Sequence, residues 1–179
     1  MKWKILSSKY ITKHKYFTSR VDKCEAPRGK IIEEYFVVEL PTTACALAIT
    51  EGGQVVMTKQ YRHPIGEVLL ELPGGFIDEN ELPEVAIARE LMEETGYSFT
   101  SVEQVGMVAA NPGVLSGFTC LFLMQGGKKI GEQNLDPNEE IEIVTMPLEE
   151  VKTLFLENRI KQSLHANCIF YALRRLGKM

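Results

Sequence analysis

The sequence predicts an α/β fold in which helices flank a mixed β-sheet, with a small β arm at the N-terminus. Strand-length apolar runs alternate with helical stripes, and Pro and Gly clusters separate them. The chain has 179 residues, of which 45% are apolar, enough for one sizeable core. We expect residues 1–40 to form the arm and residues 41–179 to form the main domain.

The first four expected strands are short runs rich in β-branched and aromatic residues. They cover residues 33–40, 43–50, 54–62 and 67–72. Gly52 and Gly53 form a hairpin turn signal between the second and third strands. The Pro73-Gly74-Gly75 segment ends the fourth.

A helix is expected next, over residues 83–95. Pro83 suits its first turn, and Gly96 supplies its C-terminal stop. The apolar positions expected to face the sheet are Val85, Ala86, Ala88, Leu91 and Met92.

The rest of the chain adds three strands and two helices. The strands are expected at residues 102–110, 118–124 and 141–146. The helices run from Leu148 to about Asn158 and from about Leu164 to Leu176, with Ser163 as N-cap and Gly177 as stop of the second.

Composition and charge exclude several classes of protein. A net charge of −4 argues against a nucleic-acid binder, which needs a basic surface. No run reaches the ~18 apolar residues of a membrane span, and we expect neither a signal peptide nor a membrane partner. The cysteines form no CxxC pair, so we interpret them as reduced core thiols of a cytoplasmic protein; they are Cys24, Cys45, Cys120 and Cys168.

The helix expected over residues 83–95 carries an unusual concentration of carboxylates. Glu90, Glu93 and Glu94 stand at i, i+3 and i+4, so they share one face and repel one another. One interpretation is a solvated acidic face on which Arg89 pairs with Glu93. The other is a site for Mg²⁺ or Mn²⁺, because carboxylates beside a Pro-Gly-Gly turn supply the oxygen ligands that these cations prefer.

The same segment resembles the signature of the Nudix hydrolase family at every fixed position. The matching residues are Gly75, Glu81, Arg89-Glu90-Leu91, Glu93-Glu94, Gly96 and Tyr97. Tyr97 replaces the smaller aliphatic residue usual there, and Leu82 stands where a capping Ser or Thr would be expected. The resemblance implies a Nudix-type α/β/α sandwich that splits a diphosphate linked to another moiety.

The resemblance also implies a role for each matching residue. The expected metal ligands are Glu90 and Glu94 directly, Glu93 third, and the carbonyl of Gly74. Arg89 is expected to orient a glutamate. Glu93 or Glu81 would act as the catalytic base if no residue outside the signature does.

Nearly the whole chain resembles the ADP-ribose pyrophosphatase branch of the family. By that likeness Arg62, in the segment 59–75, contacts a substrate phosphate, and Pro112 occupies the place of a marker proline. The segment "NEEIEI" resembles a loop that supplies an extra glutamate, which makes Glu139 the candidate general base and Glu140 the fallback. Trp3 would stack on adenine. Each residue has an alternative interpretation. Arg62 could be an exposed charge at the end of a strand, Pro112 could be a simple turn proline, and Trp3 could be a core anchor of the N-terminal region.

Relatives in this branch use their N-terminal strands to embrace a second subunit. We therefore expect a homodimer, with a monomer whose N-terminal hairpin folds back on itself as the alternative. The expected reaction is hydrolysis of ADP-ribose to AMP and ribose 5-phosphate with Mg²⁺ or Mn²⁺. A GDP-mannose or other nucleotide-sugar pyrophosphatase is the alternative enzyme, and a non-catalytic ligand-binding regulator is the alternative outside the enzymes.

Overall fold

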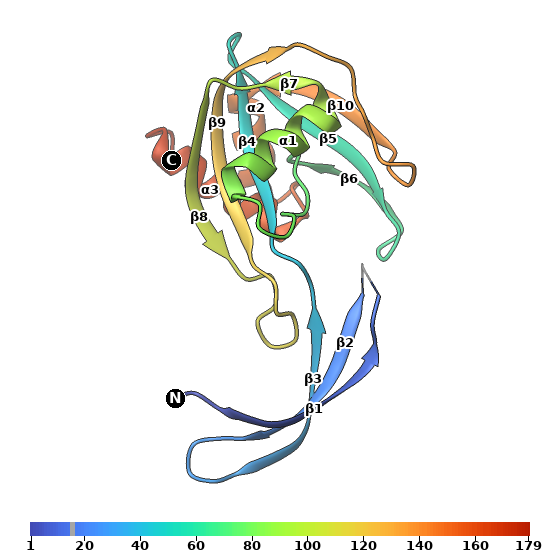
Figure 1. Ribbon diagram of the computed structural model, residues 1–179. Helices are drawn as coiled ribbons and strands as arrows, with labels where there is room; N and C mark the ends of the chain where they lie inside the picture. The colour runs from blue at the N-terminus through green and yellow to red at the C-terminus, as the bar shows by residue number, and fades with distance from the viewer. Residues whose placement is uncertain (15–16) are drawn as a thin grey trace. The chain divides into compact units, whose positions relative to one another are not determined.

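The computed structural model describes residues 1–14 and 17–179 (Figure 1). The chain divides into two compact units. The first contains residues Met1–Pro41 and Ala109–Phe118, and the second contains Thr42–Val108 and Thr119–Met179. Within the described ranges, no helix has both the length and the apolar character needed to cross a membrane.

The first unit contains a three-stranded antiparallel sheet of β1 (Lys4–Thr12), β2 (Thr18–Glu25) and β3 (Ile31–Glu39). Sequence patterns missed β2, because "TSRVDKCE" is largely polar and lacks a clear apolar alternation. Its buried carboxylate, Asp22, is accommodated because the Nε of Arg20 donates to it over 3.0 Å.

The second unit contains the expected mixed sheet, with strand order β10-β5-β4-β9-β7, β6 beside β5 and β8 beside β9. Strands β4 and β9 are parallel, whereas β5 is antiparallel to β4, β6 and β10. The strands are β4 (Thr43–Thr50), β5 (Gln54–Arg62), β6 (Glu67–Glu71), β7 (Tyr97–Ser98), β8 (Ser101–Val108), β9 (Thr119–Lys129) and β10 (Ile141–Pro147). The predicted fold class is therefore confirmed.

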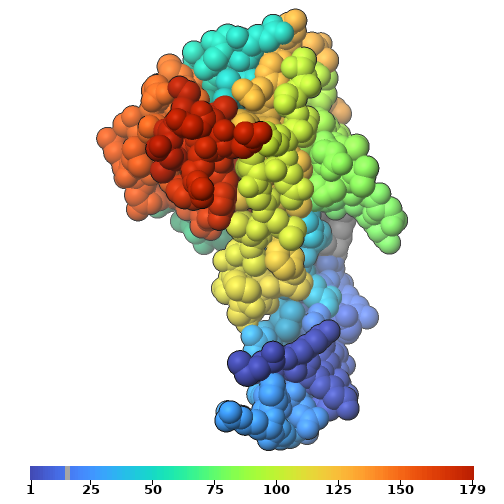
Figure 2. All heavy atoms as spheres, turned by 90° about the vertical axis from the view of Figure 1, so that its left-hand side faces the viewer, coloured from blue at the N-terminus to red at the C-terminus, as the bar shows by residue number. Residues whose placement is uncertain are grey.

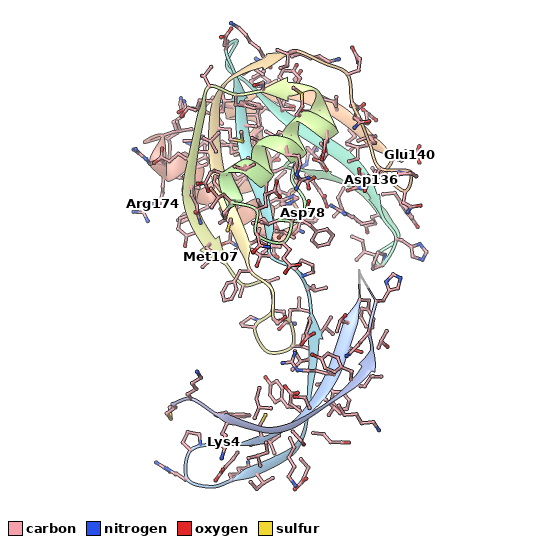
Figure 3. All side chains as sticks on the ribbon, viewed as in Figure 1. Lys4, Asp78, Met107, Asp136, Glu140 and Arg174 are labelled. Carbon is pink, nitrogen blue, oxygen red and sulfur yellow. The ribbon has the colours of Figure 1, made fainter. Side chains whose placement is uncertain are left out.

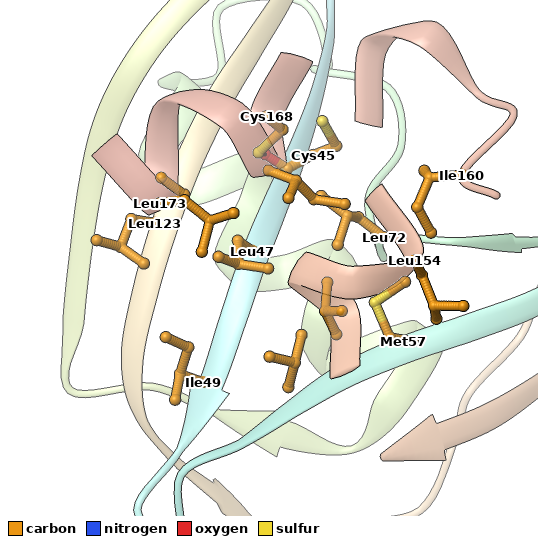
Figure 4. Packing of buried hydrophobic residues seen from close by; sticks show 14 of the residues in the cluster. Cys45, Leu47, Ile49, Met57, Leu72, Leu123, Leu154, Ile160, Cys168 and Leu173 are labelled. Atoms are coloured by element: carbon orange, nitrogen blue, oxygen red, sulfur yellow. The ribbon is translucent and has the colours of Figure 1, made fainter. Parts of the chain in front are cut away.

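Helices cover both faces of this sheet (Figure 1). Alternate residues of β4 point to opposite faces. Its alanines pack with α1 (Pro83–Thr95), and its larger side chains pack with α2 (Leu148–Leu156) and α3 (Ser163–Arg175). Figure 4 shows this second layer, where Leu47 lies among residues of α3 such as Cys168 and Leu173. All four cysteines are buried and free, as predicted.

The predicted bounds of α1 are confirmed, but its predicted buried face is partly wrong. Val85 is 52% exposed and Ala88 is also exposed, whereas Ile87 is fully buried. The helical period explains the difference, because Ile87 and Leu91 lie one turn apart on the face that packs against the sheet. Glu94 lies nearly one turn further along the same face and is therefore buried.

The start of α3 also differs from the prediction. Ser163 is its first helical residue, and Gln162 caps it by accepting a 3.0 Å hydrogen bond from the amide of Leu164. The side chain of Gln162 is longer than that of the predicted cap, a serine, and its oxygen reaches the amide of the second helical residue, as an N-cap side chain does. Figure 2 shows α3 in red beside the yellow-green β8, where Arg175 donates to Glu103 (Nε to Oε1, 2.6 Å).

Candidate functional site

The turn after β6 places Gly74 between the sheet and α1. The carbonyls before and after Gly74 accept hydrogen bonds from amides of β4 (3.2 and 2.9 Å). The amide of Gly74 instead donates to Oε2 of Glu94 over 2.9 Å. A Cβ on Gly74 would lie 2.2 Å from the carbonyl oxygen of Ala44, and its φ is 148°. Only glycine fits here, and both neighbouring carbonyls are used by β4.

Gly75 provides space for the carboxylate of Glu90. A Cβ built on Gly75 would lie 2.4 Å from Oε2 of Glu90 and 2.7 Å from its Oε1. The carboxylate therefore rests directly on the backbone of the turn. This contact gives a steric reason for the first glycine of the signature.

Arg89 joins three carboxylates of the signature. Its guanidinium donates to Glu81 (3.0 and 2.9 Å), to Glu90 (2.9 Å) and to Glu93 (3.0 Å). It also donates to the carbonyl of Phe76 (3.0 Å). These partners, Glu81 first, raise the pKa of Arg89, so the guanidinium stays charged. Arg89 has the geometry of a residue that orients glutamates.

Glu81 secures the start of α1. The N-cap residue, Leu82, makes no side-chain capping bond. Glu81 accepts two of the hydrogen bonds that Arg89 donates, and it accepts a third from the amide of Asp78 (3.0 Å). The hydrogen bonds from Arg89 lower the pKa of Glu81. This arrangement ties the entry of the helix to its middle without a capping Ser or Thr.

Glu94 and Glu90 are carboxylates in a poorly solvated position. Burial raises the pKa of Glu94 to about 8 and also raises the pKa of Glu90. The negative charge of Glu139 adds to both effects. Burial therefore disfavours the charged form of both carboxylates, and a bound cation would stabilise that form.

The donor set fits a divalent oxygen-loving cation such as Mg²⁺ or Mn²⁺. The best placed donors are Glu90, Glu94 and the Gly74 carbonyl, whereas Glu93 is 40% exposed and pairs with Arg89. Among residues 1–14 and 17–179, no three His, Cys, Asp or Glu side chains already form a metal cluster. Arg89 donates to both Glu90 and Glu93.

Arg62, at the end of β5, pairs with a carboxylate that the sequence analysis did not identify. Its Nε donates to both oxygens of Glu71 (3.1 and 3.2 Å), and its Nη2 lies 2.5 Å from Oε2. Glu71 is 1% exposed, whereas the Arg62 side chain is 42% exposed. The sequence signal that could have indicated a buried, paired carboxylate was the glutamate at position 71, near the end of the apolar run "EVLLEL".

His165 of α3 supports the same turn from the other face of the sheet. Its Nδ1 accepts a hydrogen bond from the amide of Leu72 over 3.2 Å. Burial lowers the pKa of His165 to about 3, so the ring is neutral and can accept. This contact joins residues 93 positions apart, and no local pattern could have predicted it.

Glu139 is exposed in the loop between β9 and β10, in which Figure 3 labels Asp136 and Glu140. Its Oε2 accepts a hydrogen bond from the amide of Asp136 (3.0 Å). Its charge also raises the pKa of Arg62, in addition to those of the two helix glutamates. These effects favour Glu139 over Glu140 as the loop carboxylate that faces α1.

Trp3 and Pro112 belong to the first unit. Trp3 is 44% exposed and meets Tyr35 edge-on at 5.8 Å, so the core-anchor alternative is wrong. Pro112 is exposed in a turn closed by the amide of Leu115, which donates to the carbonyl of Asn111 (2.8 Å). Their roles in substrate binding stay predictions.

The chain is similar to known proteins over most of its length. Residues 39–167 match the NUDIX domain family, and residues 3–38 match the nucleoside diphosphate sugar hydrolase N-terminal domain. A methanol dehydrogenase activator of Bacillus methanolicus is 31% identical, with 89% of each chain covered. An ADP-ribose pyrophosphatase of Bacillus subtilis is 29% identical, with 94% of each covered.

The fold recurs in the crystal structure of an ADP compounds hydrolase. That structure superposes with a TM-score of 0.84 at 19% identity and covers 100% of this chain and 98% of its own. At this identity the likeness concerns the fold alone. Because the NUDIX match spans most of the chain and includes every residue of the carboxylate helix, the chain belongs to the Nudix family.

Proposed function

We propose that this Nudix hydrolase cleaves the diphosphate bond of ADP-ribose, giving AMP and ribose 5-phosphate, with Mg²⁺ or Mn²⁺ as cofactor. The observation that carries the proposal is the gathering of two helix carboxylates at one turn, where Glu94 accepts a 2.9 Å hydrogen bond from the amide of Gly74 and the carboxylate of Glu90 lies against Gly75. The Bacillus subtilis relative is named an ADP-ribose pyrophosphatase, and it aligns over nearly its whole length.

The residues of the chain have separate tasks in this reaction. Glu90, Glu94 and the Gly74 carbonyl would hold the cation, which when bound neutralises phosphate charge and acidifies a water. Arg89 keeps Glu90 in place, and Glu139 accepts the proton of the attacking water. Water adds across the P–O–P bridge, so each product keeps one phosphate.

Arg62 is proposed to bind a substrate phosphate. The carboxylate of Glu71 accepts hydrogen bonds from Nε and Nη2 of Arg62, and these bonds fix the plane of the guanidinium. Both hydrogens of Nη1 and the second hydrogen of Nη2 remain for a phosphate. Trp3 and Pro112 are proposed to contact the nucleoside end of the substrate.

A panel of nucleoside diphosphate derivatives, assayed with Mg²⁺ and with Mn²⁺ and with products identified by mass, tests the proposal. We expect ADP-ribose to give the highest kcat/KM and to yield AMP with ribose 5-phosphate. A higher kcat/KM for GDP-mannose would assign the chain to the nucleotide-sugar alternative. No cleavage of any compound would contradict hydrolase activity.

The second candidate function is regulation of another enzyme. The relative from Bacillus methanolicus, named as an activator, is the observation that favours it. The intact carboxylate signature argues for catalysis, because a purely regulatory domain has no need for a buried carboxylate such as Glu94. The substrate panel separates the two, since a regulator would bind a nucleotide without cleaving it.

We also propose that the protein is a cytoplasmic homodimer. Every residue of β1 is exposed, and the first unit exposes an apolar set of Trp3, Ile5, Leu6, Tyr10, Ile11, Ile31 and Phe36. Such a surface is typical of one that a partner covers. The four free thiols suit a reducing compartment. Light scattering at micromolar concentration tests the dimer, and a monomer mass would contradict it.

A further inference from the structure

The chain that follows β9 crosses the C-terminal end of α1. The amides of Ile130 and Gly131 donate to the carbonyl of Gly96 (2.9 and 3.1 Å), and the amide of Asn134 donates to the carbonyl of Glu93 (2.8 Å). The last carbonyls of a helix have no partner within the helix. This stretch of chain therefore caps the helix that carries the signature carboxylates.

The side chain of Gln133 continues the contact and extends it to β10. Its Nε2 donates to the carbonyl of Glu94 (2.8 Å) and to the carbonyl of Ile141 (3.0 Å). Both hydrogens of the amide are thus used. Glu94 is the buried carboxylate of α1, and Ile141 begins β10 two residues after Glu139. A single side chain joins the acidic helix to the far end of the loop.

Between these anchors, the hydrogen bonds of residues 135–140 are local within the part of the chain that the structure describes. The amide of Asp136 donates to Oε2 of Glu139 (3.0 Å), and the amide of Glu139 donates to the carbonyl of Asp136 (2.9 Å). These bonds shape the turn without attaching it to α1. Gln133 is the side chain that links both ends of this loop to the carbonyl of Glu94.

We propose that Gln133 is a positioning residue that holds Glu139 at its working distance from the carboxylates of α1. The inference rests on the proposed role of Glu139 as the base. The geometry that supports it is that Gln133 bonds both the carbonyl of Glu94 and that of Ile141, two residues after Glu139. A base must lie within hydrogen-bond reach of the proton it accepts, and a displacement of about 1 Å can cost about 100-fold in rate.

The test compares Gln133→Met, which keeps the length of the side chain and removes both donors, with Gln104→Met. Gln104 is the matched control, because its Nε2 makes one exposed 3.3 Å bond to the carbonyl of Gly106 in its own strand. We expect Gln133→Met to lower kcat for ADP-ribose about 10- to 100-fold with little change in KM. Circular dichroism verifies that both variants are folded.

A double-mutant cycle shows whether Gln133 acts through Glu139. In a Glu139→Gln background, Gln133→Met should cause no further loss of kcat, because the base it positions is already gone. The same loss in both backgrounds would overturn the inference, since Gln133 would then act on Glu94 or on the fold. Wild-type kcat in Gln133→Met, beside a large loss in Glu139→Gln, would overturn the inference alone.

Wild-type kcat in Glu139→Gln would contradict the proposed role of Glu139 and, with it, the inference about Gln133. Failure of the proposed function and failure of the inference alone are therefore distinguishable.

Hydrogen exchange gives a readout that does not depend on turnover. The amides of Asp136 and Glu139 should exchange faster in Gln133→Met than in the Gln104→Met control. Equal exchange rates would show that Gln133 does not hold the loop, and would also overturn the inference.

Discussion

The carboxylate of Glu71 is buried against the guanidinium of Arg62, which reaches it from the neighbouring strand with Nε at 3.1 Å from Oε1. The two partners differ in solvation, because Glu71 is 1% exposed and the Arg62 side chain is 42% exposed. Glu71 therefore depends on Arg62 for its charge balance, and Arg62 depends on Glu71 for its orientation.

This asymmetry predicts unequal effects on stability. Arg62→Met leaves a buried carboxylate unpaired and should lower the free energy of unfolding by about 3–5 kcal/mol. Glu71→Gln keeps an acceptor and leaves a cation that water can reach, so the loss should be about 1–2 kcal/mol. Urea denaturation without metal measures both. Lys59→Met, which breaks an exposed pair with Glu142, should cost less than about 1 kcal/mol. Equal losses for Arg62→Met and Lys59→Met would contradict the assignment.

Acid stability should depend on His165, whose pKa is lowered to about 3 by burial. The unfolded state binds more protons than the folded state between about pH 3 and pH 6.5. The contribution of His165 to the free energy of unfolding therefore rises with pH through this window, by up to about 1.4 kcal/mol per pH unit, and is complete above about pH 6.5. The raised pKa of Glu94 contributes a slope of the opposite sign, so the effect of His165 is read as a difference between variant and wild type.

His165→Asn removes the titrating ring and keeps an acceptor for the amide of Leu72. In urea denaturation between about pH 4 and pH 7, the slope of the free energy of unfolding against pH should be less positive in His165→Asn than in wild type. A slope in His165→Asn as steep as in wild type would show that His165 is not the group responsible.

Gly75→Ala should impair catalysis while the fold persists. The new Cβ would lie 2.4 Å from Oε2 of Glu90, and the end of a flexible side chain can move aside. The displaced carboxylate should lower kcat by about 10- to 100-fold. Gly52→Ala is the control, because its Cβ would meet nothing closer than Oγ1 of Thr50 at 3.8 Å. Turnover is measured for both, and wild-type kcat in Gly75→Ala would mean that the position of Glu90 is unimportant.

Much of this molecule follows from local sequence signals. Strands β4 and β5 and helix α1 have their predicted bounds, because clear turn and capping residues flank them. The strand β2 and the buried face of α1 were not predicted correctly. In β2 the charged residues Arg20 and Lys23 pair with glutamates of β3, and in α1 a buried glutamate continues the apolar face.

The candidate site divides in the same way. The signature spacing identified the carboxylates of α1 and Arg89, because residues three and four apart share a helix face. Glu71, Gln133 and His165 were missed, since each acts through a hydrogen bond to a residue that only the folded chain brings near. Those contacts depend on strand order and on the path of a loop.

The loop carboxylate gives a prediction about catalysis alone. Glu139→Gln should lower kcat by about 10²- to 10⁴-fold, with KM for ADP-ribose little changed, because a general base acts mainly in the transition state. The melting temperature should stay close to that of wild type, since Glu139 is exposed. Glu140→Gln is the matched control and should keep its turnover. The reverse result would move the base to Glu140, and two active variants would leave Glu93 or Glu81 as the base.

The central claim is that α1 holds a divalent cation for cleavage of a diphosphate, and Mn²⁺ binding to Glu94→Gln tests it most directly. Glutamine keeps an acceptor for the amide of Gly74 and removes one ligand charge. Binding is followed by the electron paramagnetic resonance signal of free Mn²⁺, and turnover of ADP-ribose is measured on the same samples. We predict a Kd for Mn²⁺ at least about tenfold weaker than in wild type and a kcat lower by about 100-fold or more. Unchanged Mn²⁺ affinity and unchanged kcat in a folded Glu94→Gln protein would contradict the claim.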